Sequence, residues 1–452
     1  MKLAIVLPDG AADEPLPQLD GRTPLDVAII PNMDWVALHG RLGRVVSVPA
    51  GYTPGTDVAT LSLLGYDPTT CYSGRAPIEA AARGLTAGPD ELIFRCNFVT
   101  VTDGLMKDFT ADHISQEEAE RLIADLNTLT SEGHTSSPGC PTASAVGDTN
   151  SGDDSRPPSA EGGKPWATRH GGGAQGDLDA PQQGDPALQG CRFHSGVSYR
   201  NLMIISGASD LKLECAPPHD IPDQPVADHL PRGEGQERVR AIMRRAAEML
   251  RNHEVNRVRR EQGRPPVSDI WLWGQGRPVE LEPFAKRFGV SGAVITGVDI
   301  IRGLAVMMGM KLIEVPGATG YIDTNYAGKG EEAIRALDTY DLVVVHVEAP
   351  DEAGHLGDAR EKIKALERID ELIVGPLLDA LRKHDRWRIL IAPDHPTPCT
   401  TTAHDATPPP FCFAGTGVVP LAKRSFSEKE ALVGAWMVEP GHALMSRFLS
   451  GD

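Results

Sequence analysis

Long apolar runs are missing from this chain of 452 residues. A membrane-spanning helix needs roughly 18 or more consecutive apolar residues, and no stretch of the sequence reaches that length. The N-terminal sequence MKLAIVLPDG has a five-residue apolar run before Pro8, shorter than the apolar region of a secretory signal peptide. We therefore expect no membrane partner and a cytoplasmic location.

Paired cysteine motifs and an excess of positive charge are also missing. The seven cysteines form no CxxC pair, and we expect them to be free thiols, with Cys399 not a metal ligand. The net charge of −18 argues against a nucleic-acid partner. It does not exclude a small anionic substrate, because a local arginine cluster can override the overall charge.

The chain does contain three short apolar segments that each run into an aspartate. They cover residues 3–7, 342–347 and 388–392. Their Val, Ile and Leu residues are continuous rather than alternating, which is typical of parallel strands covered on both faces. Ligands of open α/β sheets bind outside the carboxyl ends of such strands. We therefore expect Asp9, Asp351 and Asp394 to converge.

A crossover helix is predicted between the last two of these strands. The apolar residues Ile363, Leu366, Ile369, Ile373, Leu377 and Leu381 recur at steps of three and four. Gly375 and Pro376 are expected to bend this helix. A second helix, over residues 239–250, is flanked by the Arg-rich sequence RVRRE and is expected to be mostly solvated.

Composition divides the chain into regions. Within residues 131–190, Gly, Pro and Ser account for 26 of 60 positions, so this segment is predicted to be a disordered insertion. Residues 1–70 and 286–452 carry the metal-binding residue types, and residues 71–285 carry arginines. This pattern predicts a discontinuous catalytic domain with an inserted substrate-binding domain that closes over the substrate.

Seven residues of the outer regions are candidate metal ligands. They are Asp9, Thr56, Asp351, His355, Asp394, His395 and His404. The four-residue spacing of Asp351 and His355 lets them share one face of a helical turn, although surface positions are the simpler explanation of that spacing alone. The prolines around Asp394 and His395 impose a sharp turn, and taken singly His404 could be structural. Together the set suffices for two adjacent metal sites, which support phosphoryl transfer.

Thr56 is the candidate nucleophile. It lies between a Pro-Gly turn and an apolar run that reads as a helix, and a helix N-terminus stabilises phosphate groups. Metal coordination would lower the pKa of its hydroxyl. The alternative is that Thr56 is simply an N-cap. Asp57 could cap the same helix, and we assign it no catalytic role.

The order of these motifs resembles that of one family. Asp9, PGTDVA, GATGYIDTNY, HVEAPDEAGH, APDH and His404 followed by PPPF match the archaeal-type cofactor-independent phosphoglycerate mutases of the alkaline phosphatase superfamily, as do GVSYR, WLWGQGR and GAVITGVDIIRG. The resemblance spans nearly the whole chain outside 131–190. It implies an α/β fold: an alkaline-phosphatase-like core with a mostly parallel sheet flanked by helices, plus an inserted smaller α/β domain.

The resemblance also implies roles for individual residues. Asp9, Thr56, Asp394 and His395 would hold one metal, and Asp351, His355 and His404 the other. Thr56 would accept the phosphoryl group of 3-phosphoglycerate and return it to give 2-phosphoglycerate, without 2,3-bisphosphoglycerate. Many relatives have Ser at the position of Thr56, and the insertion is atypical.

The ligand types suit two divalent cations, with Mn²⁺ favoured and Zn²⁺, Co²⁺ or Mg²⁺ as alternatives. Arg200, Arg277 and Arg302 are the favoured substrate-binding residues, followed by Arg75 and then Lys329. Two other reactions fit the same centre, a homoserine kinase-like transfer and a phosphatase, and the chain lacks the GxxxxGK[ST] loop of many ATP sites. A non-enzymatic binding protein is the remaining alternative. The sequence leaves the oligomeric state open.

Overall fold

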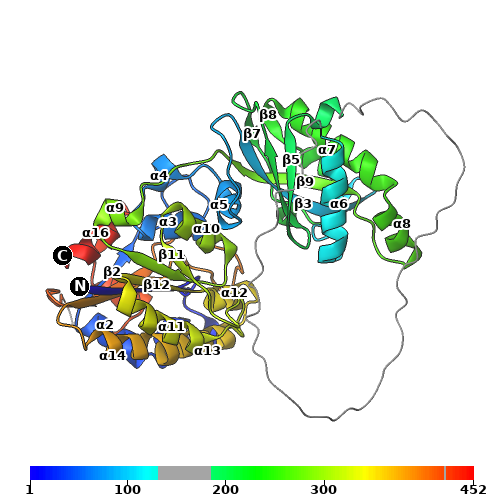
Figure 1. The fold of residues 1–452 in the computed structure, drawn as a ribbon. Coiled ribbons are helices and arrows are strands. Elements are labelled where there is room, and N and C mark those ends of the chain that lie inside the picture. Colours follow the sequence, from blue (N-terminus) through cyan, green and yellow to red (C-terminus); the bar gives the residue numbers. More distant parts are fainter. Residues whose placement is uncertain (131–184, 422–423) are drawn as a thin grey trace, which may run out of the picture.

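The computed structural model of the chain describes residues 1–130, 185–421 and 424–452. Most of the elements form two lobes that lie side by side, with both termini in the larger one (Figure 1). Within the described residues, every helix is either too short or too polar to cross a bilayer.

The large lobe is built on a mixed sheet of eight strands. Their order is β11 (Lys311–Ile313), β10 (Gly292–Ile295), β12 (Leu342–Val347), β1 (Lys2–Pro8), β13 (Trp387–Ile391), β14 (Pro410–Gly415), β2 (Arg41–Val45) and β15 (Met437–Val438). Only β14 runs antiparallel to its neighbours. The three strands predicted from continuous apolar runs are adjacent at the centre, so the expected mostly parallel sheet is confirmed.

Helices cover both faces of this sheet. One face packs against α1 (Pro24–Val27), α2 (Pro31–Leu38), α11 (Tyr326–Thr339), α13 (Ala359–Ile369), α14 (Gly375–Leu381) and α15 (Glu428–Val433). The other packs against α3 (Thr56–Leu63), α5 (Arg75–Ala82), α9 (Phe284–Phe288), α10 (Asp299–Met307) and α16 (Ala443–Ser450). Burial on both faces explains why the central strands carry no polar alternation.

The predicted crossover helix exists, and its irregularity is a π-helical turn. Residues 370–374 form this turn between α13 and α14, directly before Gly375 and Pro376. Pro376 has no N–H, and its ring would clash with the carbonyl four residues earlier in a regular helix. The wider turn avoids that clash.

The small lobe has its own sheet. Strands β4 (Leu105–Asp108), β3 (Leu92–Thr102), β6 (Arg200–Ile205) and β5 (Cys191–Val197) lie in that order, and β9 (Asp269–Gly276) also pairs with β3. Helices α6 (Gln116–Thr128), α7 (Gln236–Arg251) and α8 (Glu254–Glu261) pack on it, and β7 (Lys212–Glu214) pairs with β8 (Arg232–Glu234). The helix predicted over 239–250 lies within α7, and it buries one face, including Val239, Ile242 and Leu250.

The structure bears on the predicted insertion and on the predicted domain boundaries only in part. Most of the predicted insertion, residues 131–184, lies outside the described residues. Its last part, 185–190, is folded, because Leu188 is fully buried in the small-lobe core. The boundaries at 70/71 and 285/286 stay a prediction, since α5 contributes Ile78 to the large-lobe core and Ala80 to a cluster with small-lobe strands.

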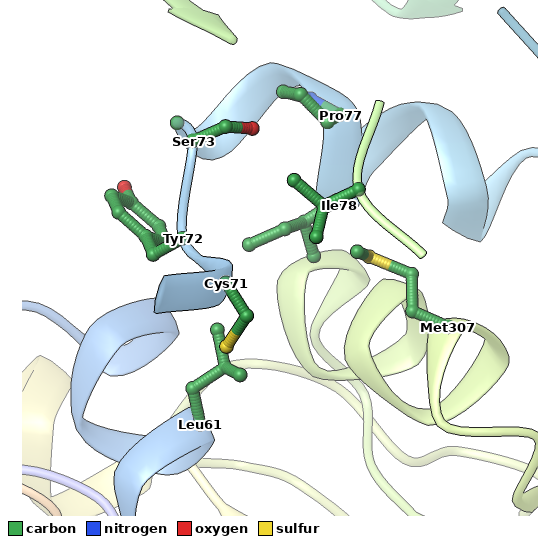
Figure 2. Close-up of a pocket in the computed structure, with 9 residues that line it drawn as sticks. Leu61, Cys71, Tyr72, Ser73, Pro77, Ile78 and Met307 are labelled. Atoms are coloured by element: carbon green, nitrogen blue, oxygen red, sulfur yellow. The ribbon is translucent and has the colours of Figure 1, made fainter. Parts of the chain in front are cut away.

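A small crevice lies where α3, α5 and α10 meet, beside the short helix α4 (Pro68–Cys71). Figure 2 shows Leu61, Ile78 and Met307 facing it, with Tyr72 at its side. Its empty volume is about 190 Å³, below the roughly 300 Å³ at which small-molecule sites begin. We interpret it as a packing gap between helices, not as the functional site.

Candidate metal centre

The three aspartates predicted to converge do so at the carboxyl ends of adjacent strands. Asp9 follows β1, Asp394 follows β13, and Asp351 lies in α12 (Ala349–His355), which follows β12. Since β12, β1 and β13 are neighbours and parallel, their ends open on one edge of the sheet. Two groups of potential ligands lie there.

The inner group consists of Asp9, Asp394, His395 and Thr56. The first three side chains are fully buried, and Thr56 is 6% exposed. His395 Nε2 lies 3.5 Å from Asp9 Oδ1, 3.5 Å from Asp394 Oδ2 and 3.4 Å from Thr56 Oγ1. Three potential ligand oxygens therefore lie within 3.5 Å of one imidazole nitrogen, and the ligand atoms of Asp9, Asp394 and His395 all lie within 4.8 Å of one another.

Two oxygens of the inner group have no hydrogen-bond partner among the described residues. Asp394 Oδ1 accepts the N–H groups of Gly10 and His395, whereas Asp394 Oδ2 is buried and unpartnered. Asp9 Oδ2 contacts His346 at 2.8 Å, whereas Asp9 Oδ1 is unpartnered. Buried carboxylate oxygens without partners are costly, and a cation between them would satisfy both.

The outer group consists of Asp351, His355 and His404. The two imidazole Nε2 atoms lie 3.0 Å apart, and they lie 3.2 and 3.5 Å from oxygens of Asp351. His355 Nδ1 is 2.9 Å from the carbonyl of Thr402, and His404 Nδ1 is 3.3 Å from that of Pro54. Donation from Nδ1 leaves Nε2 of each ring as the atom that can bind a cation once it carries no proton, as in metal-binding histidines.

The spacing of both groups fits a divalent cation. Ligands at about 2.1 Å from a tetrahedral ion are separated by about 3.4 Å, and the separations in the two groups are 3.0–3.5 Å. Each group supplies the carboxylate and imidazole ligands that manganese, cobalt and zinc accept. The residues present therefore fit two cations.

The two groups are in contact. The rings of His395 and His404 have centroids 4.2 Å apart, and the hydroxyl of Thr397 donates to Asp351 Oδ1 while lying 3.4 Å from His395 Nδ1. With Nδ1–H donated to Thr397, the Nε2 lone pair of His395 faces the inner group. Two metal ions held about 3.5–4 Å apart are the arrangement used in two-metal phosphoryl transfer.

Thr56 is the first residue of α3, and Gly55 occupies the N-cap position without a side-chain capping bond. The simple N-cap explanation for Thr56 is therefore wrong. Asp57 Oδ1 instead accepts the N–H of Val58, and its Oδ2 accepts the hydroxyl of Tyr72 at 2.7 Å. The Thr56 hydroxyl is thus directed at His395, at a helix N-terminus suited to a phosphate.

The charges at this edge are unbalanced. Burial, followed by the charges of Asp394, Glu348 and Asp351, raises the pKa of Asp9 well above its ordinary value. Burial and Asp351 raise the pKa of Glu348 to about 8. The ammonium of Lys329 is fully buried and donates to the carbonyl of His346, and burial lowers its pKa to about 8. Bound cations would relieve this repulsion between carboxylates.

In the outer group, hydrogen bonds to Asp351 favour the protonated form of the histidines in the absence of a cation. A hydrogen bond with Asp351 raises the pKa of His355 to about 9 despite its partial burial. Burial opposes ionisation of Asp351, but hydrogen bonds from His355 and His404 outweigh it and hold the pKa of Asp351 well below its usual range. Binding of a metal must therefore displace protons here.

A buried ion pair braces the two turns that carry the inner ligands. Lys362, on α13, donates to the carbonyls of Ala12 and Thr397 and to Asp13 Oδ2 at 2.8 Å. Both side chains of the pair are fully buried. This contact ties the turn after β1 to the turn after β13.

A group of arginines lies between the lobes, on α5 and the small-lobe strands. Arg75 and Arg95 both contact Glu79, at 3.4 and 3.2 Å, and Arg95 also lies over the ring of Trp273. Burial and the positive charges of Arg75 and Arg200 lower the pKa of Arg95 to about 10. This concentration of positive charge favours an anionic ligand.

The arginine group borders the metal centre through Arg75. Burial opposes its charge, but Asp57, Glu79, Tyr72 and Glu348 raise the pKa of Arg75. Burial, and to a smaller extent the positive charge of Arg200, lower the pKa of Arg83. Arg83 Nη2 also donates a hydrogen bond to the Arg200 carbonyl at 3.5 Å.

The other two predicted arginines are engaged elsewhere. Arg277 Nη2 donates to the carbonyls of Ala208, Ser209 and Leu211 and so holds a turn of the small lobe. Arg302 pairs with Glu314. Both stay predictions as substrate ligands.

Several residues of this site were missed from the sequence. Glu348 follows a predicted strand, and the strand-end rule that found Asp9 would have found it. His346 lies within that strand, and Arg83 and Arg95 lie in α5's C-cap and β3. No local pattern marks these three, because only the packing of distant segments brings them to the site.

Comparison with known proteins identifies the family of the chain. A family model described as "Metalloenzyme superfamily" matches residues 1–440. The curated 2,3-bisphosphoglycerate-independent phosphoglycerate mutase of Methanothrix thermoacetophila is 41% identical over 100% of both chains. The enzyme named 2,3-bisphosphoglycerate-independent phosphoglycerate mutase 2 of Methanothermobacter thermautotrophicus is 42% identical over 98% of this chain and 96% of its own length.

Solved structures agree in fold. The PH0037 protein of Pyrococcus horikoshii has a TM-score of 0.72 at 26% identity and covers 100% of this chain and 98% of its own. The cofactor-independent phosphoglycerate mutase of Thermoplasma acidophilum has a TM-score of 0.59 at 25% identity, with 100% of both chains covered. The expected alkaline-phosphatase-like fold is thereby confirmed. The chain belongs to the Metalloenzyme superfamily and, within it, to the 2,3-bisphosphoglycerate-independent phosphoglycerate mutases, a family of isomerases.

Proposed function

We propose that this protein interconverts 3-phosphoglycerate and 2-phosphoglycerate through a phosphothreonine formed on Thr56, without 2,3-bisphosphoglycerate. One observation carries the proposal: the Thr56 hydroxyl, at the N-terminus of α3, lies 3.4 Å from His395 Nε2, which itself lies 3.5 Å from the unpartnered oxygens of Asp9 and Asp394. The named activity of the relatives supports the same reaction.

Asp9, Thr56, Asp394 and His395 would hold one divalent cation, and Asp351, His355 and His404 the second. When bound, such ions lower the pKa of a coordinated hydroxyl and neutralise phosphoryl oxygens. We retain Mn²⁺ as the favoured ion because the ligands are carboxylates and imidazoles. The proposed substrate is small and phosphorylated, and we retain the cytoplasm as the compartment of this glycolytic reaction.

The Thr56 oxygen would attack the phosphorus of 3-phosphoglycerate. The bond from phosphorus to the 3-oxygen breaks as the bond to Thr56 forms; the Thr56 hydroxyl gives up its proton, and the leaving glycerate oxygen takes one up. Glycerate then turns within the site, its 2-hydroxyl gives up its proton as it attacks the phosphothreonine, and the Thr56 oxygen leaves and is reprotonated. The N–H groups at the start of α3 favour the phosphoryl group throughout.

Glycerate must stay bound between the two transfers. The arginines between the lobes, Arg75, Arg95 and Arg200 above all, supply the positive charge that a carboxylate requires. Retention there, with water excluded, separates a mutase from a phosphatase on the same centre.

The test is an enolase-coupled assay of the purified full-length chain loaded with Mn²⁺, using 3-phosphoglycerate and no added 2,3-bisphosphoglycerate. We expect steady formation of 2-phosphoglycerate with little free phosphate. Release of phosphate alone would identify a phosphatase. Absence of turnover together with ATP-dependent phosphorylation of homoserine would identify the kinase-like alternative.

A further inference from the structure

His346 lies behind the inner metal group and is absent from the ligand sets given above. It is fully buried on β12, with Leu7 of β1 as its strand partner. Its Nε2 lies 2.8 Å from Asp9 Oδ2, and its Nδ1 lies 3.2 Å from the hydroxyl of Thr296. Both ring nitrogens therefore have a partner within hydrogen-bond distance.

The partner on the Nδ1 side favours one tautomer. The Thr296 oxygen accepts the N–H of Val298 at 3.0 Å, and among the described residues His346 Nδ1 is the acceptor recorded for its hydroxyl proton. Donation from Thr296 places the lone pair of His346 on Nδ1. The single ring proton is then on Nε2, where it can be donated to Asp9.

Donation to Asp9 has a consequence for the metal ligand. Because Asp9 Oδ2 is occupied by the imidazole, Asp9 Oδ1 is the oxygen left without a partner, and it is the one that lies 3.5 Å from His395 Nε2. The contact with His346 thus orients the carboxylate so that one chosen oxygen faces the inner group. Partners of this kind fix the direction of a ligand and its affinity for metal.

The alternative is that His346 is itself a ligand, because Asp9, His346 and Glu348 lie close enough to share an ion. The distance argues against this. Two ligands at 90° on an ion with bonds of about 2.1 Å lie about 3.0 Å apart, and His346 Nε2 is 2.8 Å from Asp9 Oδ2, an ordinary hydrogen-bond length.

We infer that Thr296 and His346 form a relay that orients Asp9, and that His346 is a positioning residue for the inner metal site and not one of its ligands. The inference rests on the proposed two-metal centre and adds to it the residues that aim one ligand. It concerns metal affinity and can be tested whichever reaction the centre catalyses.

The first measurement is the protonation of the His346 ring in the full-length protein, by ¹⁵N NMR of ¹⁵N-histidine-labelled chain assigned with H346Q. With and without Zn²⁺, we expect a protonated Nε2 and an unprotonated Nδ1. An unprotonated Nε2 that shifts on addition of Zn²⁺ would show direct coordination and overturn the inference.

The second measurement is Mn²⁺ affinity in an H355A background, in which the outer site is disabled and the inner site titrates alone. We expect H346L, which cannot donate, to bind Mn²⁺ about 10–100-fold more weakly. H346Q, whose amide can donate from the Nε2 position, should stay within a few-fold of the parent. Equal loss in both variants would overturn the relay.

Thr296 provides a matched pair that leaves the histidine in place. T296V removes the hydroxyl at nearly constant volume, and T296S keeps it. We expect weaker Mn²⁺ binding and a mixture of His346 tautomers in T296V, and parental behaviour in T296S. Unchanged affinity and tautomer in a folded T296V would overturn the role of Thr296, and with it the relay. These outcomes are independent of the enolase-coupled assay, so failure of the proposed mutase reaction would be recognised separately.

Discussion

Thr56 differs from other hydroxyls of the chain in what surrounds it. It is buried, begins a helix and lies 3.4 Å from a histidine whose own partners are carboxylates. Thr60, one turn later on α3, is fully buried, and its hydroxyl has no partner among the described residues. Position relative to the ligands, more than residue type, makes Thr56 the candidate nucleophile.

Replacement of Thr56 separates chemistry from metal binding. We expect T56A to lower kcat in the enolase-coupled assay by at least about a thousandfold, because no acceptor for the phosphoryl group remains. Elemental analysis should still find two metal ions per chain, since three inner ligands persist. T56S keeps a hydroxyl and should retain activity within about tenfold. Full activity of T56A would exclude Thr56 as the nucleophile.

A half-buried carboxyl away from the centre makes stability depend on pH. Glu428 accepts the N–H of Asp13 and the hydroxyl of Thr23, and burial raises its pKa to about 7. A raised pKa in the folded state means that its contribution to stability is complete below about 4.5, the value for an exposed glutamate, and is lost as pH rises through 7.

E428Q tests this directly. Because the amide carries no charge to desolvate, we expect E428Q to be more stable than the parent by about 1–2 kcal/mol at pH 8 and nearly equal to it at pH 5. Urea unfolding at the two pH values is the measurement. E430Q, at an already hydrogen-bonded surface position on the same helix, is the control and should not show this pH dependence.

Among the elements, the π-helical turn at residues 370–374 has a local cause, Pro376, and a tertiary consequence for the neighbouring helix α11. Pro376 makes a regular helix impossible, and the widened turn brings the carbonyl of Leu372 against α11 at Gly330. A Cβ built on Gly330 would lie 2.2 Å from that carbonyl oxygen. Glycine is thus required in the middle of α11 by contact with a neighbouring helix, against its poor helix propensity.

G330A should therefore destabilise the protein although alanine is the better helix former. We expect a net loss of about 1–3 kcal/mol in the free energy of unfolding, because the backbone of the turn must move. G434A is the matched control, since its added Cβ would meet atoms at 3.5 Å, an ordinary contact. A G330A protein as stable as the parent would show that the helices separate at little cost.

For the whole molecule, the proposed metal centre joins three strand ends, α3 and the loop that carries His404, so its occupancy should affect the entire large lobe. Removal of metal leaves Asp9, Asp394 and Glu348 close together in a buried site. We expect dialysis against a chelator to lower Tm by several degrees, and added Mn²⁺ to restore it in proportion to its concentration. A Tm independent of Mn²⁺ would contradict the proposed centre.

Metal binding should also depend on pH through His355. Its pKa of about 9 in the metal-free protein means that the imidazole is protonated at pH 7 and must lose that proton to bind a cation. Outer-site affinity for Mn²⁺ should therefore rise between pH 7 and 9 and level off above. The stability of the metal-free protein should change with pH in the opposite direction. The contribution of the His355–Asp351 pair to its stability is complete below about pH 6.5 and is lost as pH rises through 9.

Calorimetric titration in buffers of different ionisation enthalpy would count the protons released on binding. We expect H355A to release fewer protons than the parent at pH 7.5. Equal proton release would indicate that His355 is neutral before the metal arrives.

Much of the large lobe was predictable because its signals are local. Continuous Val, Ile and Leu runs mark strands buried on both faces, and a polar residue directly after such a run marks the ligand-binding edge. The apolar period from Ile363 to Leu381 marks one crossover helix, although a proline signals only an irregularity and not a π-turn. Arg259 shows the limit: it belongs to the Arg-rich sequence that flanks the helix predicted over 239–250, and no local pattern indicates that it is fully buried and pairs with Glu118 at 2.7 Å.

By itself, the sequence determined the residue types of the centre, the strands that carry them and the turn that presents Thr56, because each depends on neighbours a few positions away. Only the tertiary structure decided which oxygen of each aspartate faces inward, which arginines approach the site and why His346 lies behind Asp9. Those outcomes depend on contacts between segments hundreds of residues apart, and hydrogen-bond partners and buried charge exist only after these segments have packed together.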